Sequence, residues 1–178
     1  MAVNIVERID DRIKVNHVLL SVSDKRGLES LAPALIEINP AVTLYSTGGT
    51  YQALEKMLGD RAARNLKSVS DYTGQPEMQG GLVKTLDYKI YMGLLSETYN
   101  EAHADDLMRV NGVAIDLVIV NLYPFRETIA KPGATVEMAR ANIDIGGPCM
   151  VRAAAKNYLR VASVTDPADY DRIIGELR

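Results

Sequence analysis

The sequence predicts an α/β domain, a three-layer sandwich in which a mostly parallel central sheet is covered by helices on both faces. Short apolar runs typical of fully buried strands, such as residues 18–20 and 117–120, alternate with segments of helical periodicity. Polar or glycine-rich residues follow these strands, as in open parallel sheets that bind ligands at the carboxyl edge. Both observations favour one doubly covered sheet.

The composition restricts the class of protein. A chain of 178 residues, 47% hydrophobic and 24% charged, suits one domain, residues 17–178, preceded by an arm, residues 1–16. The sequence contains no apolar run of about 18 residues, so it predicts no membrane span. Glu7, Asp10 and Asp11 interrupt what would be the apolar core of a signal peptide, so we expect a cytoplasmic protein. One cysteine and two histidines argue against a disulfide or a metal site, and the net charge of −3 argues against nucleic-acid binding.

The expected elements follow in regular order. Strands are predicted at residues 17–23, 42–45, 67–69, 116–121 and 161–164. Helices are predicted at residues 26–38, 51–58, 97–111, 135–142, 148–157 and 167–177. Pro33 predicts a kink or a shortened first helix, and residues 89–95 fit a strand and a helix equally well. Residues 71–81, rich in glycine, proline and polar side chains, predict a long functional loop.

A glycine turn, Ser-Thr-Gly-Gly-Thr at residues 46–50, joins the second strand to a helix. Such a turn directs backbone N–H groups and hydroxyls to the positive end of the helix dipole, which suits a phosphate. An ordinary tight turn is the alternative. Polar residues that leave the neighbouring strand favour the phosphate site. The candidate ligands are Ser21, Ser23, Lys25, Thr47, Gly48, Gly49 and Thr50.

Residues 142–157 are interpreted as a loop that leads into a helix beginning at Pro148. Asp144 lies in the loop, while Arg152 and Lys156 lie four residues apart on one helical face, so both signs of charge can converge on one spot. A solvated helix with an incidental acidic residue is the alternative.

Asn121 and Tyr123 end the clearest central strand and are followed by Pro124. An amide and a phenol at this place can offer hydrogen bonds to a heterocycle, although Tyr123 can equally well cover the core. Together with the glycine turn and Asp144, these residues are expected at one edge of the sheet.

These motifs together resemble the IMP cyclohydrolase domain of bifunctional purine biosynthesis proteins, which join a cyclohydrolase to an AICAR transformylase. The similarity runs from about residue 17 to the C-terminus. The motifs are LSVSDK (20–25), STGGT (46–50), SDYTG (70–74), VKTL (83–86), NLYPF (121–125), NIDIGG (142–147) and RAAAKN (152–157). The resemblance implies a methylglyoxal-synthase-like fold and closure of the formamide of FAICAR onto its carboxamide, giving IMP and water without a metal or cofactor.

The resemblance also assigns roles to residues. The phosphate would bind Ser23, Lys25 and residues 47–50. Catalytic residues would be Lys84, Tyr123, Asp144 and Lys156, with Asp144 as the base and the cations and phenol stabilising the developing oxyanion. The other expected substrate-binding residues are Ser21, Thr85, Asn121 and Gly146.

The chain departs from the family pattern close to the chemistry. Where the family reads Gly-Arg-Val-Lys-Thr-Leu-His-Pro-Lys-Ile-His-Gly-Gly, residues 81–93 carry Leu82, Asp87, Tyr91 and Met92 in place of an arginine, two histidines and a glycine. Leu82 cannot replace a guanidinium, and Asp87 adds negative charge near an anionic ligand. A non-catalytic nucleotide-binding or scaffold subunit of a split purine-biosynthesis enzyme is therefore the alternative to a stand-alone cyclohydrolase.

A third interpretation, methylglyoxal synthase, needs a histidine-type acid in the cleft. Neither His17 nor His103 is predicted at the carboxyl end of a strand. A homodimer and a separate transformylase protein are kept open as partners of a chain whose substrate is a small molecule.

Overall fold

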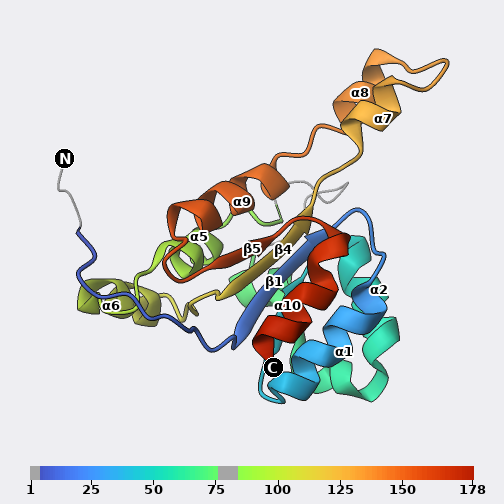
Figure 1. Cartoon of the computed structure of the whole chain (residues 1–178). Helices are drawn as coiled ribbons and strands as arrows, with labels where there is room; N and C mark the ends of the chain where they lie inside the picture. Colours follow the sequence, from blue (N-terminus) through green and yellow to red (C-terminus); the bar gives the residue numbers. More distant parts are fainter. Residues whose placement is uncertain (1–4, 76–83) are drawn as a thin grey trace.

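The computed structural model describes residues 5–75 and 84–178, and five parallel strands form its sheet, in the order β3-β2-β1-β4-β5 (Figure 1). The strands are β1 His17–Val22, β2 Thr43–Ser46, β3 Leu66–Ser68, β4 Leu117–Asn121 and β5 Ala162–Val164. Leu19 of the central strand pairs with Tyr45 on one side and Val118 on the other. The predicted α/β class with a parallel sheet is confirmed.

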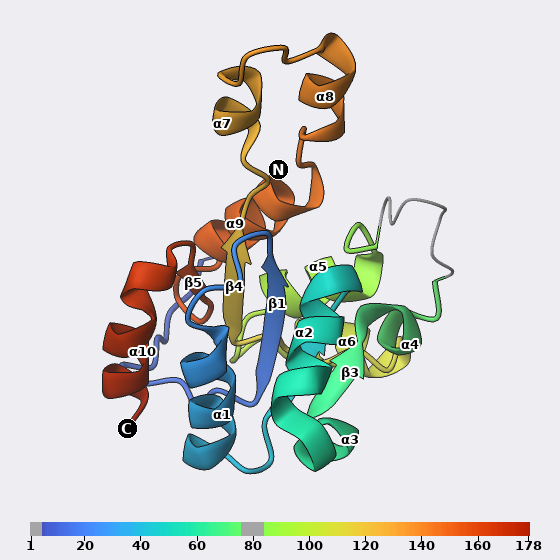
Figure 2. The ribbon, with the colours of Figure 1, turned by 90° about the vertical axis from the view of Figure 1, so that its right-hand side faces the viewer.

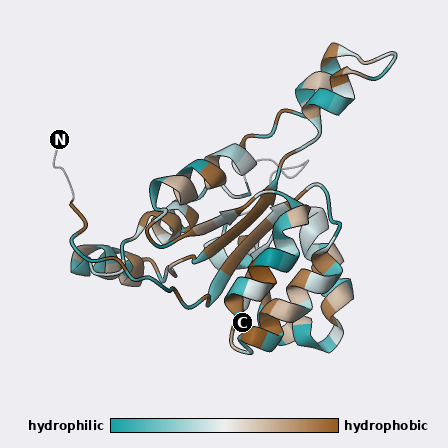
Figure 3. Cartoon of the chain, viewed as in Figure 1, coloured by the Kyte–Doolittle hydropathy of each residue, from teal (hydrophilic) through white to brown (hydrophobic). Residues whose placement is uncertain are grey.

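Helices cover both faces of the sheet because successive side chains of a strand point to opposite sides. Leu20 and Leu44 belong to the core beneath α1 (Leu28–Ile38), α2 (Gly48–Leu58) and α10 (Tyr170–Leu177). Leu19 and Val118 belong to the core beneath α4 (Val69–Thr73), α5 (Tyr88–Leu95) and α9 (Gly146–Lys156). Figure 2 shows the strands between these two layers, and Figure 3 shows that the central strands are largely hydrophobic.

Two short helices project from this sandwich. They are α7 (Phe125–Ile129) and α8 (Val136–Ala141), which form a hairpin between β4 and α9, well away from the sheet in both views (Figures 1 and 2). The remaining elements are η1 Gly59–Arg61, α3 Ala62–Asn65, α6 Glu101–Arg109 and η2 Pro167–Asp169. No helix in the described ranges has the length and apolar character needed to cross a membrane.

Several boundaries differ from the sequence prediction. Pro33 lies inside an unbroken α1, which six buried apolar residues hold against the sheet. Residues 89–95, left undecided above, are helical, because Ile90 and Leu94 reach the core at helical spacing and Asp87 caps the helix. The helix expected from residue 97 begins only at Glu101, after the Asn100 cap.

Both glycine motifs lie inside helices. Helix α2 begins at Gly48 instead of residue 51, and α9 begins at Gly146 instead of Pro148. The loop expected at residues 71–81 is helical as far as Thr73, and residues 76–81 lie outside the described part. Residues 5–16 form neither helix nor strand.

The amino edge of the sheet is held by a buried ion pair between Arg160 and Asp116, whose atoms Nη1 and Oδ1 lie 2.9 Å apart. The other carboxylate oxygen accepts the backbone N–H groups of Asn16 and His17 at 2.8 and 2.9 Å. Burial lowers the pKa of Arg160, and the neighbouring carboxylate opposes that shift. One charged pair therefore ties together the starts of β1, β4 and β5.

Candidate functional site

The predicted site residues lie mostly at the carboxyl edge of the sheet. The chain builds β1, β2 and β3 outward in one direction and then returns to place β4 and β5 on the other side of β1. The strand order therefore reverses between β1 and β4, and open α/β sheets bind ligands outside the carboxyl ends of the strands at such a point. Residues 23–25 and 121–123 leave the sheet there.

The glycine turn forms the first turn of α2, and two lysines converge on it. The first bond within this helix runs from Tyr51 N–H to the Thr47 carbonyl at 3.2 Å, so the three preceding N–H groups have no partner inside the helix. A Cβ built on Gly48 would lie 3.4 Å from Lys84 Nζ, and one on Gly49 would lie 3.9 Å from Lys25 Nζ. The missing side chains leave room for an anion between the lysines and the helix end.

The conformation and capping of this turn also suit an anion. Gly48 has a φ of 50°, in the left-handed region that glycine favours. Thr47 is the N-cap residue, yet its hydroxyl makes no capping hydrogen bond with the helix. Lys25 Nζ donates to the carbonyl of Ser23 at 3.4 Å, while Ser21 lies half-buried on β1.

Thr85, beside Lys84 in the chain, connects this turn to the Asp144 loop. The Thr85 side chain is buried, and its Oγ1 would lie only 2.5 Å from a Cβ built on Gly146. Lys84 lies against α2 at the same time. Two consecutive residues therefore link the first turns of α2 and α9.

Asp144 is held at the first turn of α9. Its Oδ1 accepts the Gly147 N–H at 2.8 Å. A Cβ built on Gly147 would lie 2.8 Å from Asp144 Oδ2 and 2.5 Å from Leu122 Cδ2, so only glycine fits here without displacement. Gly147 was missed as a site residue, although it repeats the Gly-Gly pattern of the turn at Gly48. Leu122 lies beside this turn, and the next residue, Tyr123, has 53% of its area exposed.

Asn121 and Thr50 are directed at the backbone. Asn121 Oδ1 accepts the Asp24 N–H at 2.7 Å, and its Nδ2 donates to the Asp24 carbonyl at 2.8 Å. The Thr50 hydroxyl accepts from Val22 N–H at 3.2 Å and donates to the Val22 carbonyl at 3.0 Å.

Lys156 does not join Asp144. It is the last residue of α9 and is exposed, whereas Asp144 precedes the first. The helix rises about 1.5 Å per residue, so the ten steps from Gly146 to Lys156 span about 15 Å. The expected convergence of Lys156 and Asp144 is not confirmed in this chain.

The departures from the family pattern have different surroundings. Asp87 Oδ1 accepts the Lys89 N–H at 2.8 Å, so this carboxylate caps α5. Burial of the Tyr91 phenol, together with the neighbouring Cys149, raises the pKa of Tyr91 to about 12, so the phenol stays neutral. Leu82 lies outside the described residues.

Charge near the turn is partly balanced. Arg26 Nε donates to Asp24 Oδ2 at 2.8 Å, and this hydrogen bond holds the pKa of Asp24 below its ordinary value. The negative charge next to Lys25 therefore has its own cation. Within residues 5–75 and 84–178, no three His, Cys, Asp or Glu side chains gather as metal ligands would.

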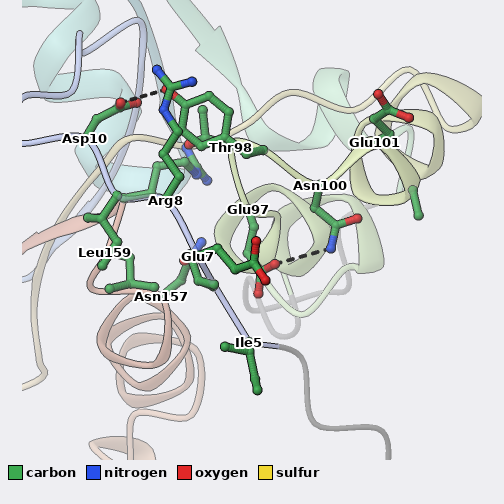
Figure 4. Close-up of a pocket in the computed structure, with 15 residues that line it drawn as sticks. Ile5, Glu7, Arg8, Asp10, Glu97, Thr98, Asn100, Glu101, Asn157 and Leu159 are labelled. Carbon is green, nitrogen blue, oxygen red and sulfur yellow. Dashed lines mark hydrogen bonds between the residues drawn. The ribbon is translucent and has the colours of Figure 1, made fainter.

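A cavity of about 520 Å³ lies at the other edge of the sheet, between residues 5–10, residues 97–102 and the chain after α9. Figure 4 shows two hydrogen bonds among its side chains, one between Asn100 and Glu97 and one that ends on Asp10. The Tyr99 hydroxyl donates to Asp10 Oδ1 at 2.7 Å. The Arg8 guanidinium stacks on the Tyr99 ring, with its carbon Cζ 4.0 Å from the ring centroid. The expected site residues contribute nothing to this cavity, so the carboxyl edge is the better candidate site.

The chain is similar to several known proteins. The model of the MGS-like domain matches residues 27–149. The bifunctional purine biosynthesis protein PurH of Synechococcus sp. (strain CC9605) is 51% identical over 156 residues, which are 88% of this chain and 29% of that protein. PurH of Magnetococcus marinus is 47% identical over 165 residues, 93% of this chain and 30% of that protein. The chain thus spans about 30% of the length of these relatives.

Among solved structures, the crystal structure of ForH superimposes with a TM-score of 0.75 at 34% identity. The match covers 90% of this chain and 76% of that one.

Proposed function

Because this chain belongs to the family of MGS-like domains, and is similar to one part of the bifunctional purine biosynthesis proteins, we propose that it is an IMP cyclohydrolase. It closes the ring of FAICAR to give IMP and water. The observation that carries the proposal is the position of Lys84 and Thr85, which link the first turn of α2 at Gly48 to the first turn of α9 at Gly146, where Asp144 is held.

The phosphate binds at the first turn of α2 in this proposal. Three backbone N–H groups without partners inside the helix, the helix dipole and Lys25 favour an anion there. The ribose then directs the base toward the first turn of α9, because Thr85 packs against Gly146. A nucleoside lacking the phosphate loses most of these contacts and should bind much more weakly than IMP.

Ring closure requires proton transfer and charge stabilisation. The carboxamide nitrogen adds to the formyl carbon, and the carbonyl electron pair moves onto oxygen. Asp144 accepts the nitrogen's proton on Oδ2, since its Oδ1 already accepts the Gly147 N–H. Lys84 and the phenol of Tyr123 stabilise the oxyanion. The oxygen then leaves as water with that proton and the proton of the formamide nitrogen, and the C=N bond forms.

Beyond this proton transfer and charge stabilisation, the site needs to supply little to the reaction. Both reacting groups belong to one substrate, so holding them together already makes the reaction intramolecular. Lys156 is given no role in this mechanism because α9 carries it away from Asp144.

The proposal is tested by following IMP formation from FAICAR by absorbance with the purified protein, and by calorimetry with IMP and inosine. We expect turnover, and IMP affinity at least about a hundredfold above that of inosine. IMP binding without turnover would overturn the enzyme proposal in favour of a non-catalytic nucleotide-binding subunit. Equal affinity for IMP and inosine would show that the phosphate does not bind at α2.

A further inference from the structure

The segment that follows β1 is held from both sides by side chains. From β4, the Asn121 amide bonds both the N–H and the carbonyl of Asp24, at 2.7 and 2.8 Å. From α2, the buried Thr50 hydroxyl bonds both the N–H and the carbonyl of Val22. Each side chain therefore makes the two hydrogen bonds that the backbone of a neighbouring strand would make within a sheet.

This segment carries a cation of the proposed phosphate site. Val22 is the last residue of β1, paired with Asn121, and beyond it the chain has left the sheet. Lys25 follows three residues later, and its Nζ lies 3.9 Å from a Cβ built on Gly49. The position of the Asp24 backbone therefore sets the point from which the Lys25 side chain starts.

We infer that Asn121 is a positioning residue, whose amide places Lys25 at the phosphate through the backbone of Asp24. It does not recognise the base. The inference rests on the proposed function and deepens it, because it assigns to the phosphate end a residue whose place at the end of a strand suggested a contact with the heterocycle. Both polar atoms of the amide already have backbone partners at short distances, as a clamp requires.

The two roles of Asn121 predict different energetics. If Asn121 acts through Lys25, its loss weakens binding of the phosphate alone, and the effects of the Asn121 and Lys25 substitutions on affinity are coupled. If Asn121 instead contacts the base, its loss weakens binding of nucleoside and nucleotide alike, and the effect is independent of Lys25. Loss of a neutral hydrogen bond typically changes an equilibrium by roughly fivefold, and two such bonds are lost in Asn121→Ala. We therefore expect IMP affinity to fall by up to about twenty-fivefold.

The experiment is a double-mutant cycle of Asn121→Ala and Lys25→Ala, with IMP and inosine as calorimetric probes. The double variant should bind IMP nearly as well as Lys25→Ala alone, and inosine affinity should not change in Asn121→Ala. Asn100→Ala is the matched control, because this amide caps α6 at the other edge of the molecule. Additive losses for IMP, or equal losses for IMP and inosine, would overturn the inference.

A second measurement does not depend on ligand binding. Amide hydrogen exchange at Asp24 should become at least about tenfold faster in Asn121→Ala. Asn121→Gln, which keeps the amide but changes its reach, serves the same cycle if the alanine variant does not fold. Unchanged exchange at Asp24 would refute the clamp even where IMP binds. Faster exchange in a protein that does not bind IMP would instead refute the proposed function and leave the clamp standing.

Discussion

Gly147→Ala should impair catalysis by moving the carboxylate proposed as the base. An added Cβ would lie 2.5 Å from Leu122 Cδ2 and 2.8 Å from Asp144 Oδ2. Carbon atoms in contact normally lie about 3.5–4.0 Å apart, so Leu122, Asp144 or the start of α9 must move by about 1 Å. A misplacement of that size can lower a rate by about a hundredfold, and we expect kcat to fall by this order.

The assay is IMP formation from FAICAR, with thermal unfolding measured in parallel. Alanine in a helix gains about 0.4–1 kcal/mol over glycine, and this gain opposes an overpacking cost of about 1–3 kcal/mol. The net loss of stability should therefore be about 2 kcal/mol or less. Gly175→Ala in α10 is the matched control, because no atom lies within 4 Å of its added Cβ. Its rate should equal that of the wild type.

One result would refute this reasoning. If Gly147→Ala turns over at a rate within about twofold of the wild type, the added Cβ displaces no group that the chemistry needs, and the expectation that it misplaces Asp144 is wrong.

Three further predictions concern the catalytic groups, the amino edge and metals. Lys84→Ala and Asp144→Asn should each lower kcat at least about tenfold, with little change in the temperature of unfolding. If Lys84→Ala changes only KM, that lysine binds the phosphate instead of stabilising the oxyanion. Arg160→Met leaves Asp116 buried without its cation and should cost roughly 3–5 kcal/mol in urea unfolding, while a cost below about 1 kcal/mol would contradict the role given to the pair. Turnover should be unchanged by a chelator, and restoration of a lost rate by a divalent ion would disprove this.

The central strands β1 and β4 could be predicted from the sequence because burial on both faces leaves a continuous apolar run. Residues 117–120 are all buried, and the prediction there depended on nothing else. The starts of α2 and α9 were less predictable, since Gly48 and Gly146 suit a turn as well as a first helical residue. The hairpin of α7 and α8 could not be foreseen as a projection. Its apolar residues, such as Val136 with 88% exposure, would suggest burial.

The sequence indicates which candidate residues follow a strand end, but it does not give distances along a helix. Helical periodicity shows which residues share a face, but it says nothing about how far apart they lie along the axis. Lys156 shares a face with Arg152, yet it lies a full helix length away from Asp144. Likewise, the sequence cannot show whether Asn121 at a strand end faces a ligand or the neighbouring backbone.

The two edges of the sheet handle charge in opposite ways, and this difference supports the location of the site. At the amino edge, Arg160 and Asp116 are buried and hydrogen-bonded to backbone groups of several segments, so an anion could pair with Arg160 only by breaking those bonds. At the carboxyl edge, Lys25 and Lys84 are half-buried and lie beside glycines whose missing side chains leave space. The first turn of α2 offers backbone N–H groups to an arriving anion, which the buried ion pair at the amino edge cannot do. Substitutions at the amino edge should therefore affect the free energy of unfolding, and those at the carboxyl edge ligand affinity, with little overlap between the two sets.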